Sequence, residues 1–288
     1  VFGAVLDETM TARHVCARTE EELAPMRGSK YVQSDLGDGF RQVKELLDNG
    51  TPVLFSGVPC QVDGFKRYLG KSYDNLLTCD LVCHGVPSPA VFRAWLDGLE
   101  TARGAKVTGV RFKDKSHGWS HPWLTVTFAD GSVYTEDFNR TGYGRGFGMQ
   151  LFLRPACALC KYTSTSRPAD FTLADYWGLD PKLELPVERD KGVSMVLVNS
   201  ARGQVVYDAL AGQFGQTDRP LDEAVTGNPR LKSPLKANPK RGAFFAAFAA
   251  LPFQEVEKRF LALPPLHYRA AAKLLTPAMK DRLRKLLK

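Results

Sequence analysis

The sequence predicts an α/β fold: a partly parallel sheet flanked by helices, an antiparallel strand extension and a helical C-terminal tail. In the first hundred residues, short and almost wholly apolar runs alternate with amphipathic helical segments. Strands buried on both faces have such runs, and their alternation with helices favours a parallel sheet. From about residue 107 the apolar residues recur at every second position instead, which is typical of half-buried antiparallel strands.

The first half of the chain supplies the parallel part of the sheet. Asn49-Gly50 is a helix-ending signal, while Ser88 and Pro89 fit the N-cap and first helical position of a later helix. The expected elements are strand 1–6, helix 39–50, strand 52–57, helix 60–70, strand 75–85 and helix 87–99. Strand and helix therefore alternate regularly up to residue 99.

The second half supplies the antiparallel extension and the helical tail. Segments 107–114, 123–138 and 170–178 alternate like antiparallel strands, with Asp130-Gly131 as a hairpin turn. Segment 192–210 predicts a strand, a turn and a helix, and helical spacing follows the proline-rich stretch after residue 228. We place a boundary near 220, which separates a larger α/β domain (1–220) from a helical, basic extension (221–288).

Composition narrows the class of protein. The chain has 288 residues, of which 44% are hydrophobic, so it can fill a core without disulfide bonds. No apolar run approaches the roughly 20 residues that cross a bilayer, and no secretory leader is visible. Six cysteines in such a chain fit a reducing compartment, so we expect a cytoplasmic protein without a membrane partner. A chain that starts at Val1 within an apolar run reads as a fragment whose upstream part is missing.

The net charge of +8 is concentrated in the tail. Residues 269–288 contain seven Lys or Arg and one Asp, a net charge of +6. Aromatic residues are not interleaved with these basic residues, so the tail does not predict nucleic-acid binding. The simplest interpretation is a solvated helix face. A partner-binding helix stays open, because four apolar residues share one face: Met279, Leu283, Leu286 and Leu287.

The cysteines suggest one site at the edge of the sheet. Cys157 and Cys160 form a C-x-x-C pair, whereas Cys60 and Cys83 each follow a predicted parallel strand. Cys60 and Cys83 would then both lie at the carboxyl edge of the sheet, where open α/β sheets bind ligands. Cys60 would begin a helix, whose dipole is expected to favour its thiolate. Four converging thiolates suit zinc or an iron–sulfur cluster, and the dispersed spacing favours a cluster.

The remaining candidates near this site have structural interpretations. Cys79 lies within a predicted strand and Cys16 near a strand end, so both are expected to be core thiols. His84 follows Cys83 directly, and we expect it to be hydrogen-bonded to backbone rather than to act as a further ligand.

Six motifs in a fixed order carry a family resemblance. They are "RGSKYVQSDLG" (27–37), "LFSGVPCQVDGFKRYLG" (54–70), "DLVCHGVPSP" (80–89), "FKDKSHGW" (112–119), "LRPACALCKY" (153–162) and "DFTLADYWG" (170–178). From Val1 to about residue 245 the chain resembles the beta-subunit family of coenzyme F-420 hydrogenases and dehydrogenases. The resemblance implies a flavin-dependent oxidoreductase that passes electrons between FAD and iron–sulfur centres, in some members to or from a deazaflavin coenzyme F-420.

The resemblance also implies site residues. The ligands of a [4Fe-4S] cluster would be Cys60, Cys83, Cys157 and Cys160. The FAD would lie near the "RGSKYVQ" loop, at Arg27, Gly28, Ser29, Lys30, Tyr31 and Gln33. A glycine–serine loop with basic residues is suited to a pyrophosphate, although a basic surface turn has the same composition.

Two further motifs are expected to complete the flavin site. Lys113, Lys115 and Trp119 are the candidate catalytic residues, because they offer positive charge and a stacking ring to the flavin or its partner. The alternative is a solvated lysine turn with a packing tryptophan. The site could be lined by three residues that follow the end of a strand, Asp175, Tyr176 and Trp177. Lys191-Gly192 is a weaker candidate.

Two functions stay open at this stage. The first is the flavin and [4Fe-4S] oxidoreductase, with ferredoxin, another iron–sulfur subunit or a deazaflavin coenzyme as redox partner. The alternative is a non-catalytic four-cysteine module, holding zinc or a cluster, that acts as a partner-binding subunit. The sequence does not decide the oligomeric state. Many family members carry an upstream ferredoxin-like segment and a flavin loop, so part of the FAD site is expected to lie outside this chain.

Overall fold

Two sheets organise the chain. The computed structural model describes all residues except 117, 120–122, 181–182, 186–187, 264–278 and 280–288. The strands are β1 Phe2–Leu6, β2 Ala12–Cys16, β3 Val53–Ser56, β4 Leu76–Leu81, β5 Val107–Asp114, β6 Trp123–Phe128, β7 Val133–Asp137, β8 Phe171–Asp175 and β9 Ser194–Val198. The α-helices are α1 Glu20–Leu23, α2 Gly39–Asp48, α3 Pro59–Leu69, α4 Pro89–Arg103, α5 Gly142–Gly148, α6 Ala201–Ala209, α7 Leu221–Gly227, α8 Arg241–Ala250 and α9 Phe253–Val256.

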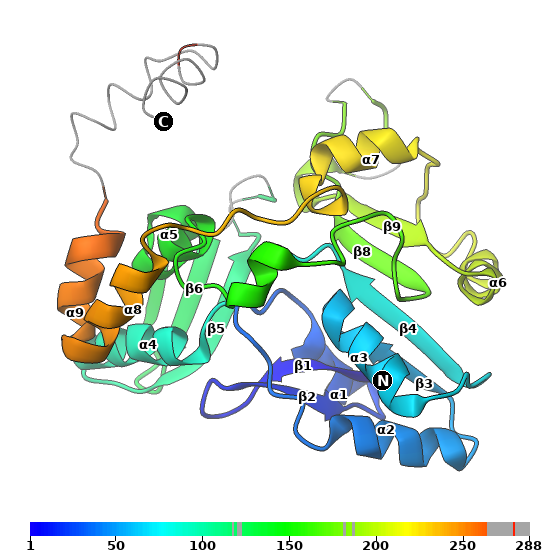
Figure 1. Cartoon of the computed structure of the whole chain (residues 1–288), viewed down its shortest axis with the longest axis horizontal. Coiled ribbons are helices and arrows are strands. Elements are labelled where there is room, and N and C mark those ends of the chain that lie inside the picture. The colour runs from blue at the N-terminus through cyan, green and yellow to red at the C-terminus, as the bar shows by residue number, and fades with distance from the viewer. Residues whose placement is uncertain (117, 120–122, 181–182, 186–187, 264–278, 280–288) are drawn as a thin grey trace.

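The larger sheet confirms the predicted partly parallel architecture. Its six strands in the described residues follow the order β2-β1-β3-β4-β8-β9. The central strands β1, β3, β4 and β8 are parallel, and β2 and β9 pair antiparallel with them at the two edges. With α1, α2, α3, α6 and α7, this sheet forms what we name the cysteine lobe (Figure 1).

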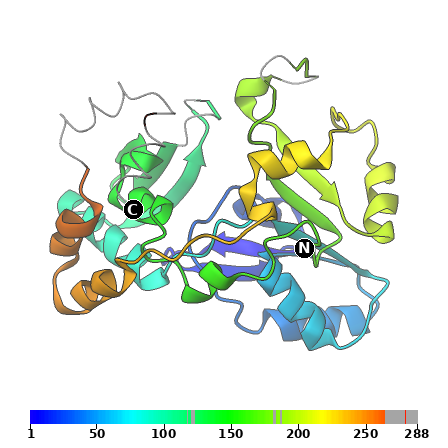
Figure 2. The same cartoon turned by 45° about the horizontal axis from the view of Figure 1, so that its top comes forward.

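The smaller sheet is an antiparallel meander with the order β5-β6-β7. Gly131 in the β6–β7 turn has φ +80°, a conformation that glycine adopts without strain, so the predicted hairpin is confirmed. With α4, α5, α8 and α9 this sheet forms what we name the aromatic lobe, and Figure 2 shows both lobes side by side.

One strand belongs to a different sheet from the one its pattern indicated. Segment 170–178 was expected among the antiparallel strands, yet β8 pairs in parallel with β4 through Cys79–Phe171 and Asp80–Thr172. Its alternating pattern reflects the antiparallel partner β9 at the sheet edge. Strand β8 therefore brings residues 171–175 beside the carboxyl end of β4.

Each lobe has its own hydrophobic core. In the cysteine lobe, α2 and α3 pack Val43, Val62 and Phe65 against Phe55 of β3. In the aromatic lobe, rings from α4, α5 and α8 meet β5, and Tyr143, Phe152 and Phe244 are fully buried. Aromatic side chains bury large apolar areas, so they dominate the stability of such a core.

The segment after the predicted boundary at 220 packs on both lobes. Ala224 of α7 and Leu231 pack beside β8 and β9, while Phe244 and Val256 lie in the core of the aromatic lobe. The boundary itself stays a prediction. The amphipathic face predicted for the tail falls outside the described residues, apart from Met279.

No helix in the part of the chain that the structure describes combines the length and the apolar character needed to span a membrane.

Candidate functional site

The turns after β3 and β4 leave the same edge of the sheet. Ser56, the last residue of β3, is in register with Cys79 of β4, and the two strands are parallel. Cys60 is the second residue of α3, and Cys83 comes two residues after β4 ends. The carboxyl edge of the sheet therefore carries both cysteines, as the sequence predicts.

The C-x-x-C loop lies against the Cys83 turn. Residues 155–159 form a single 3₁₀ turn that holds Cys157, and Cys160 ends it. The amide of Arg154 donates to the Val86 carbonyl at 2.9 Å, and the amide of Val86 donates to Cys157 Sγ at 3.5 Å. A Cβ at Gly85, where φ is +104°, would meet the Leu153 side chain at 2.9 Å, so glycine permits this close approach.

The four thiols lie in one electrostatic neighbourhood. Burial, together with smaller contributions from the neighbouring Cys157, Cys60 and Cys160, raises the pKa of Cys83 to about 12. Burial also raises the pKa of Cys60, and the neighbouring Cys160 and Cys157 raise it by smaller amounts. The expectation that the helix dipole favours the Cys60 thiolate is therefore wrong, because desolvation and the neighbouring thiols raise its pKa instead.

The ligand set itself stays a prediction. Among the described residues, no group of three or more His, Cys, Asp or Glu side chains is arranged to hold a metal ion.

The other two cysteines and His84 have the following environments. Cys79 is 8% exposed within β4 and its pKa is raised by burial to about 12, while Cys16 packs against the core of the cysteine lobe. The expectation for His84 is wrong, because its Nε2 is buried without a hydrogen-bond partner and its ring packs 4.9 Å from that of Phe147. The ring packs on an aromatic side chain instead of lying beside a backbone acceptor.

A cavity of about 740 Å³ lies where the two lobes meet. Its wall comes from the "RGSKYVQ" loop, both cysteine turns, the end of β8 and the segment after α7. These lining segments are 28–32, 56–58, 81–87, 173–175 and 227–230. Lys113 and Trp177 are among the other residues that line it. The volume is within the range of about 300–1,000 Å³ that is usual for cofactor and ligand sites.

The "RGSKYVQ" loop divides into lining and supporting residues. Lys30 lines the cavity, donates from Nζ to the Pro25 and Arg27 carbonyls at 2.7 and 3.0 Å, and has its pKa lowered to about 8 by burial. Tyr31 stacks on Phe147 with the ring centroids 4.7 Å apart. Gly28 and Ser29 also line the cavity, whereas Arg27 and Gln33 are not among its described lining residues.

The loop is attached to both cysteine turns. The amide of Gln33 donates to the Pro87 carbonyl at 3.1 Å, next to the Cys83 turn. The side chain of Gln61 donates to Ser34 Oγ at 3.0 Å and accepts from the Val58 amide at 3.0 Å. The predicted flavin loop is thus held against the start of α3 and the end of β4.

The lysine–tryptophan motif meets "ADYWG" at one end of the cavity. Lys113 of β5 forms an ion pair with Asp175 at the end of β8, and Trp119 donates from Nε1 to the same carboxylate at 3.1 Å. The rings of Trp119 and Trp177 stack with their centroids 4.5 Å apart. Lys113 Nζ lies 5.3 Å from the centroid of Trp177. A cation, a carboxylate and two indoles therefore converge from both lobes.

The other residues predicted near this motif have separate positions. Lys115 is exposed and donates from Nζ to the Lys191 carbonyl at 2.9 Å, outside the described cavity lining. A Cβ at Gly192 would meet the ring of Trp119 at 2.7 Å, so this glycine makes room for the indole. Tyr176 packs into the core beneath β8 and β9 instead of facing the cavity.

Unsatisfied polar atoms around the cavity are compatible with a polar cofactor such as FAD. His14 Nδ1, His84 Nε2 and Arg230 Nη1 are buried without a hydrogen-bond partner, and all three residues line the cavity. Buried polar groups in native proteins are usually hydrogen-bonded. A ligand with nitrogen and oxygen acceptors and donors, as a flavin nucleotide has, would satisfy them.

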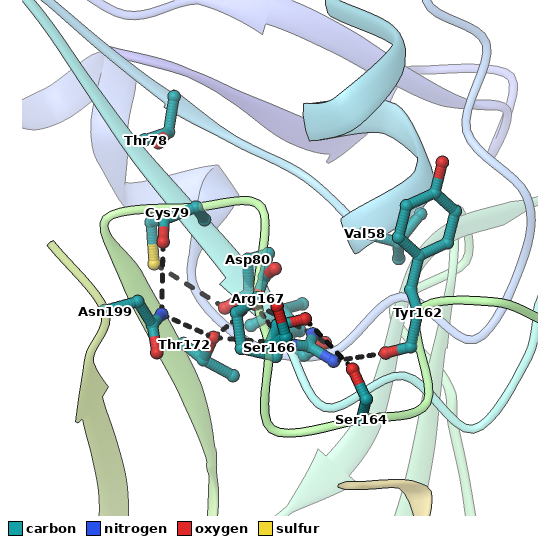
Figure 3. Close-up of polar contacts among 12 residues, drawn as sticks. Val58, Thr78, Cys79, Asp80, Tyr162, Ser164, Ser166, Arg167, Thr172 and Asn199 are labelled. Carbon is teal, nitrogen blue, oxygen red and sulfur yellow. Dashed lines mark hydrogen bonds and ion pairs between the residues drawn. The ribbon is translucent and has the colours of Figure 1, made fainter. Parts of the chain in front are cut away.

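Sequence reasoning missed a buried ion pair beside the site. Arg167 Nη2 lies 2.9 Å from Asp80 Oδ1, and the two side chains are 1% and 0% exposed (Figure 3). Asp80 is part of the "DLVCHG" motif, but an arginine in a serine- and threonine-rich loop carries no signal of burial. No motif pointed to Asn228 and Arg230 as residues of the cavity wall either.

Comparison with known proteins gives a family. The family model for the C terminus of the beta subunit of coenzyme F420 hydrogenase/dehydrogenase matches residues 50–218. A search of curated proteins finds no match. Among solved structures, a chain of the F420-reducing [NiFe] hydrogenase complex from Methanosarcina barkeri is similar, with 17% identity, 83% of each chain covered and a TM-score of 0.48.

Proposed function

Since the chain belongs to the coenzyme F420 hydrogenase/dehydrogenase beta-subunit family, we propose that it is a flavin- and [4Fe-4S]-dependent oxidoreductase. In this proposal it passes electrons between FAD and iron–sulfur centres, with coenzyme F-420 as the candidate substrate. The family resemblance seen in the motifs is confirmed by the match, and the family consists of hydrogenase and dehydrogenase subunits.

One observation carries the proposal: the predicted flavin loop and a predicted cluster ligand border the same cavity. Residues 28–32 and the turn with Cys83 both line it, and the Gln33–Pro87 hydrogen bond holds them together. Electron transfer between two centres needs them close to each other. A cavity bordered by both groups supplies that proximity.

The loop residues are suited to an anionic nucleotide. Gly28, Ser29 and Lys30 line the cavity, and such a loop can offer the backbone amides and the positive charge that a pyrophosphate needs. When bound, FAD exchanges electron pairs with a substrate and single electrons with a cluster.

Lys113 is the residue best placed to act on the reaction. Its ammonium group is mostly buried, contacts Asp175 and lies over the Trp177 ring at the cavity wall. Positive charge beside a redox-active ring stabilises its anionic form, and this is one of the few ways a protein tunes such a cofactor. Asp175 and Trp119 hold Lys113 and Trp177 in position, so we assign them a positioning role.

The surface over the C-x-x-C pair suits a redox partner. Leu159, between Cys157 and Cys160, is 87% exposed, and Arg154 and Lys161 beside it are exposed as well. Transient electron-transfer complexes use small interfaces, and opposite charges guide their encounter. We therefore propose that an acidic partner, such as a ferredoxin or another iron–sulfur subunit, approaches here.

Cofactor content tests the proposal. Protein purified without oxygen and reconstituted with iron and sulfide is expected to be brown, with about four iron atoms per chain. Added FAD should then bind with a stoichiometry near one, measured by its absorbance and quenched fluorescence. Stoichiometric zinc without iron or flavin would contradict the proposal and favour the four-cysteine partner-binding module. Iron without any flavin binding would contradict the part of the proposal that assigns FAD to the chain.

A further inference from the structure

We propose that four side chains form a clasp that fixes the two halves of the four-cysteine site relative to each other. The clasp consists of Asp63, Tyr162, Arg167 and Asp80. Arg167 and Tyr162 belong to the loop that follows Cys160, Asp80 to β4 and Asp63 to α3. Its role toward a cluster rests on the function proposed above, whereas its role in holding the thiols does not.

Arg167 connects the C-x-x-C loop to the end of β4. Its Nη1 donates to the Tyr162 carbonyl at 2.7 Å, and its Nη2 donates to the Leu81 carbonyl at 2.9 Å. The same Nη2 contacts Asp80 Oδ1 at 2.9 Å, and Figure 3 shows the guanidinium group between the loop and the strand. One planar group thus bonds chain segments that are 86 residues apart in the sequence.

Tyr162 extends the clasp to α3. Its hydroxyl donates to Asp63 Oδ2 at 2.6 Å, and Lys161 Nζ lies 3.6 Å from the same carboxylate oxygen. Asp63 is three residues after Cys60, within one helical turn of it. The loop is therefore bonded to α3 by a side chain of Tyr162 and to β4 through its carbonyl.

The positions of these contacts along the chain carry the inference. Tyr162 comes two residues after Cys160, Leu81 two residues before Cys83, and Asp63 three residues after Cys60. Each segment that carries a cysteine of the site is thus held close to that cysteine. Since a cluster needs its four thiolates at fixed separations, contacts so near the ligands decide whether the ligands fit it.

Stability alone does not account for a buried ion pair here. Replacing such a pair by apolar residues of similar volume is often neutral or stabilising, because two charges lose their hydration on burial. Burial raises the pKa of Asp80, even though Thr172 donates to its Oδ1 at 2.6 Å and Arg167 lies beside it. Arginine offers five donors in a rigid fork, which a lysine or an apolar residue lacks. Its four acceptors here specify one arrangement of the loop: Asp80 Oδ1, Thr172 Oγ1 and the carbonyls of Tyr162 and Leu81.

Arg167→Met tests the clasp, with Arg202→Met as the matched control. Arg202 also donates from Nη1 to backbone carbonyls, those of Tyr73 and Leu76, but at the opposite end of β4. We expect Arg167→Met to weaken iron retention after anaerobic reconstitution by about 10- to 100-fold, as loss of contacts around ligands usually does. Arg202→Met is expected to change it less than about twofold, since it lies far from the thiols.

A metal-free measurement separates the clasp from the proposed cofactor. Dibromobimane bridges neighbouring thiols, so mass spectrometry of the apo chain reports the yield of bridges between Cys160 and Cys60 or Cys83. That yield should fall in Arg167→Met and stay at the wild-type level in Arg202→Met. If wild-type protein binds no iron at all, the proposed function fails, but these yields still decide whether the clasp exists.

The double variant Asp80→Asn with Arg167→Met excludes a purely electrostatic role. It removes the uncompensated buried carboxylate, so we expect its unfolding midpoint to recover toward wild type. Iron retention and the bridge yield should stay low, because the bonds to Tyr162 and Leu81 are still missing. The clasp would be overturned if iron retention and the bridge yield both recovered in the double variant. It would also be overturned if Arg167→Met and Arg202→Met changed these two readouts equally. Arg167→Lys offers a folded alternative, expected to be intermediate in both.

Discussion

The interior of the aromatic lobe and the carboxyl edge of the cysteine lobe are stabilised by different kinds of contact. In the aromatic lobe, rings such as Tyr143, Phe152 and Phe244 pack with centroids 5.2 to 5.8 Å apart and are fully buried. At the carboxyl edge of the cysteine lobe, loops are held by hydrogen bonds and ion pairs, among them Arg167–Asp80. Packing of rings supplies stability without regard to direction, whereas hydrogen bonds fix positions. We therefore expect substitutions in the two lobes to affect different properties.

The largest expected effect on the cysteine lobe is that of Cys83→Ser. A serine hydroxyl is a poor ligand for iron, so this variant should lose the cluster while the fold persists. The matched control is Cys79→Ser, four residues earlier on β4, whose thiol lies in the core and is expected to be no ligand. Iron and acid-labile sulfide per chain, measured without oxygen, report the difference.

Two outcomes for the variants Cys83→Ser and Cys79→Ser would change the assignment of the cluster ligands. Iron that survives in both variants would exclude Cys83 as a ligand. Iron that disappears in both, with circular dichroism unchanged, would place Cys79 within the ligand set instead of the core.

The largest expected effect on the aromatic lobe is that of Phe244→Ala. This fully buried ring of α8 contacts Phe152 and Phe260, and its loss should lower the free energy of unfolding by about 3–5 kcal/mol. Iron per folded chain should not change, because α8 holds none of the cysteines. Chemical denaturation followed by tryptophan fluorescence gives the first quantity, and iron analysis of the folded fraction gives the second.

The same variant tests the predicted boundary near residue 220. If 221–288 is an independent extension, Phe244→Ala should leave the unfolding of the rest of the chain unchanged. A single transition, shifted as a whole to lower denaturant, would instead show that α8 folds together with the aromatic lobe.

Most of the fold was predictable from sequence, because the apolar runs and caps of the first hundred residues leave few alternatives. The sheet partner of β8 was not predictable, since a strand with one parallel and one antiparallel neighbour can alternate like any antiparallel strand. Strand order alone predicts that Cys60 and Cys83 lie at one edge of the sheet, whereas the C-x-x-C loop is held there by contacts such as the one from the Val86 amide to Cys157 Sγ. Arg167 was not found, because its burial depends on acceptors 86 and 87 residues earlier in the chain.

A smaller effect is expected where the two lobes meet. Lys113 is on β5 of the aromatic lobe, and its partner Asp175 is on β8 of the cysteine lobe. Lys113→Gln removes the charge at the cavity wall, so coenzyme F-420 reduction by reduced methyl viologen should slow by about 10- to 100-fold. FAD content should stay near that of wild type.

Lys115→Gln is the control for Lys113→Gln. The Lys115 ammonium group contacts the Lys191 carbonyl outside the described cavity lining, so less than about a twofold change is expected. Equal losses in both variants would indicate a general effect of charge on substrate approach, and neither lysine would then have a role at the cavity.

The smallest expected effect concerns Lys30 of the "RGSKYVQ" loop, and it depends on pH. Burial lowers the pKa of Lys30 to about 8, below that of an exposed lysine, so the free protein loses this charge as pH rises through 8. An anionic pyrophosphate binds the protonated form better, so FAD affinity should fall by up to about tenfold per pH unit above pH 8. Lys30→Gln should bind weakly without this slope, and Lys30→Arg should bind well at every pH. FAD titrations from pH 7 to 10 measure all three, and an unchanged slope in Lys30→Gln would assign the titration to another group.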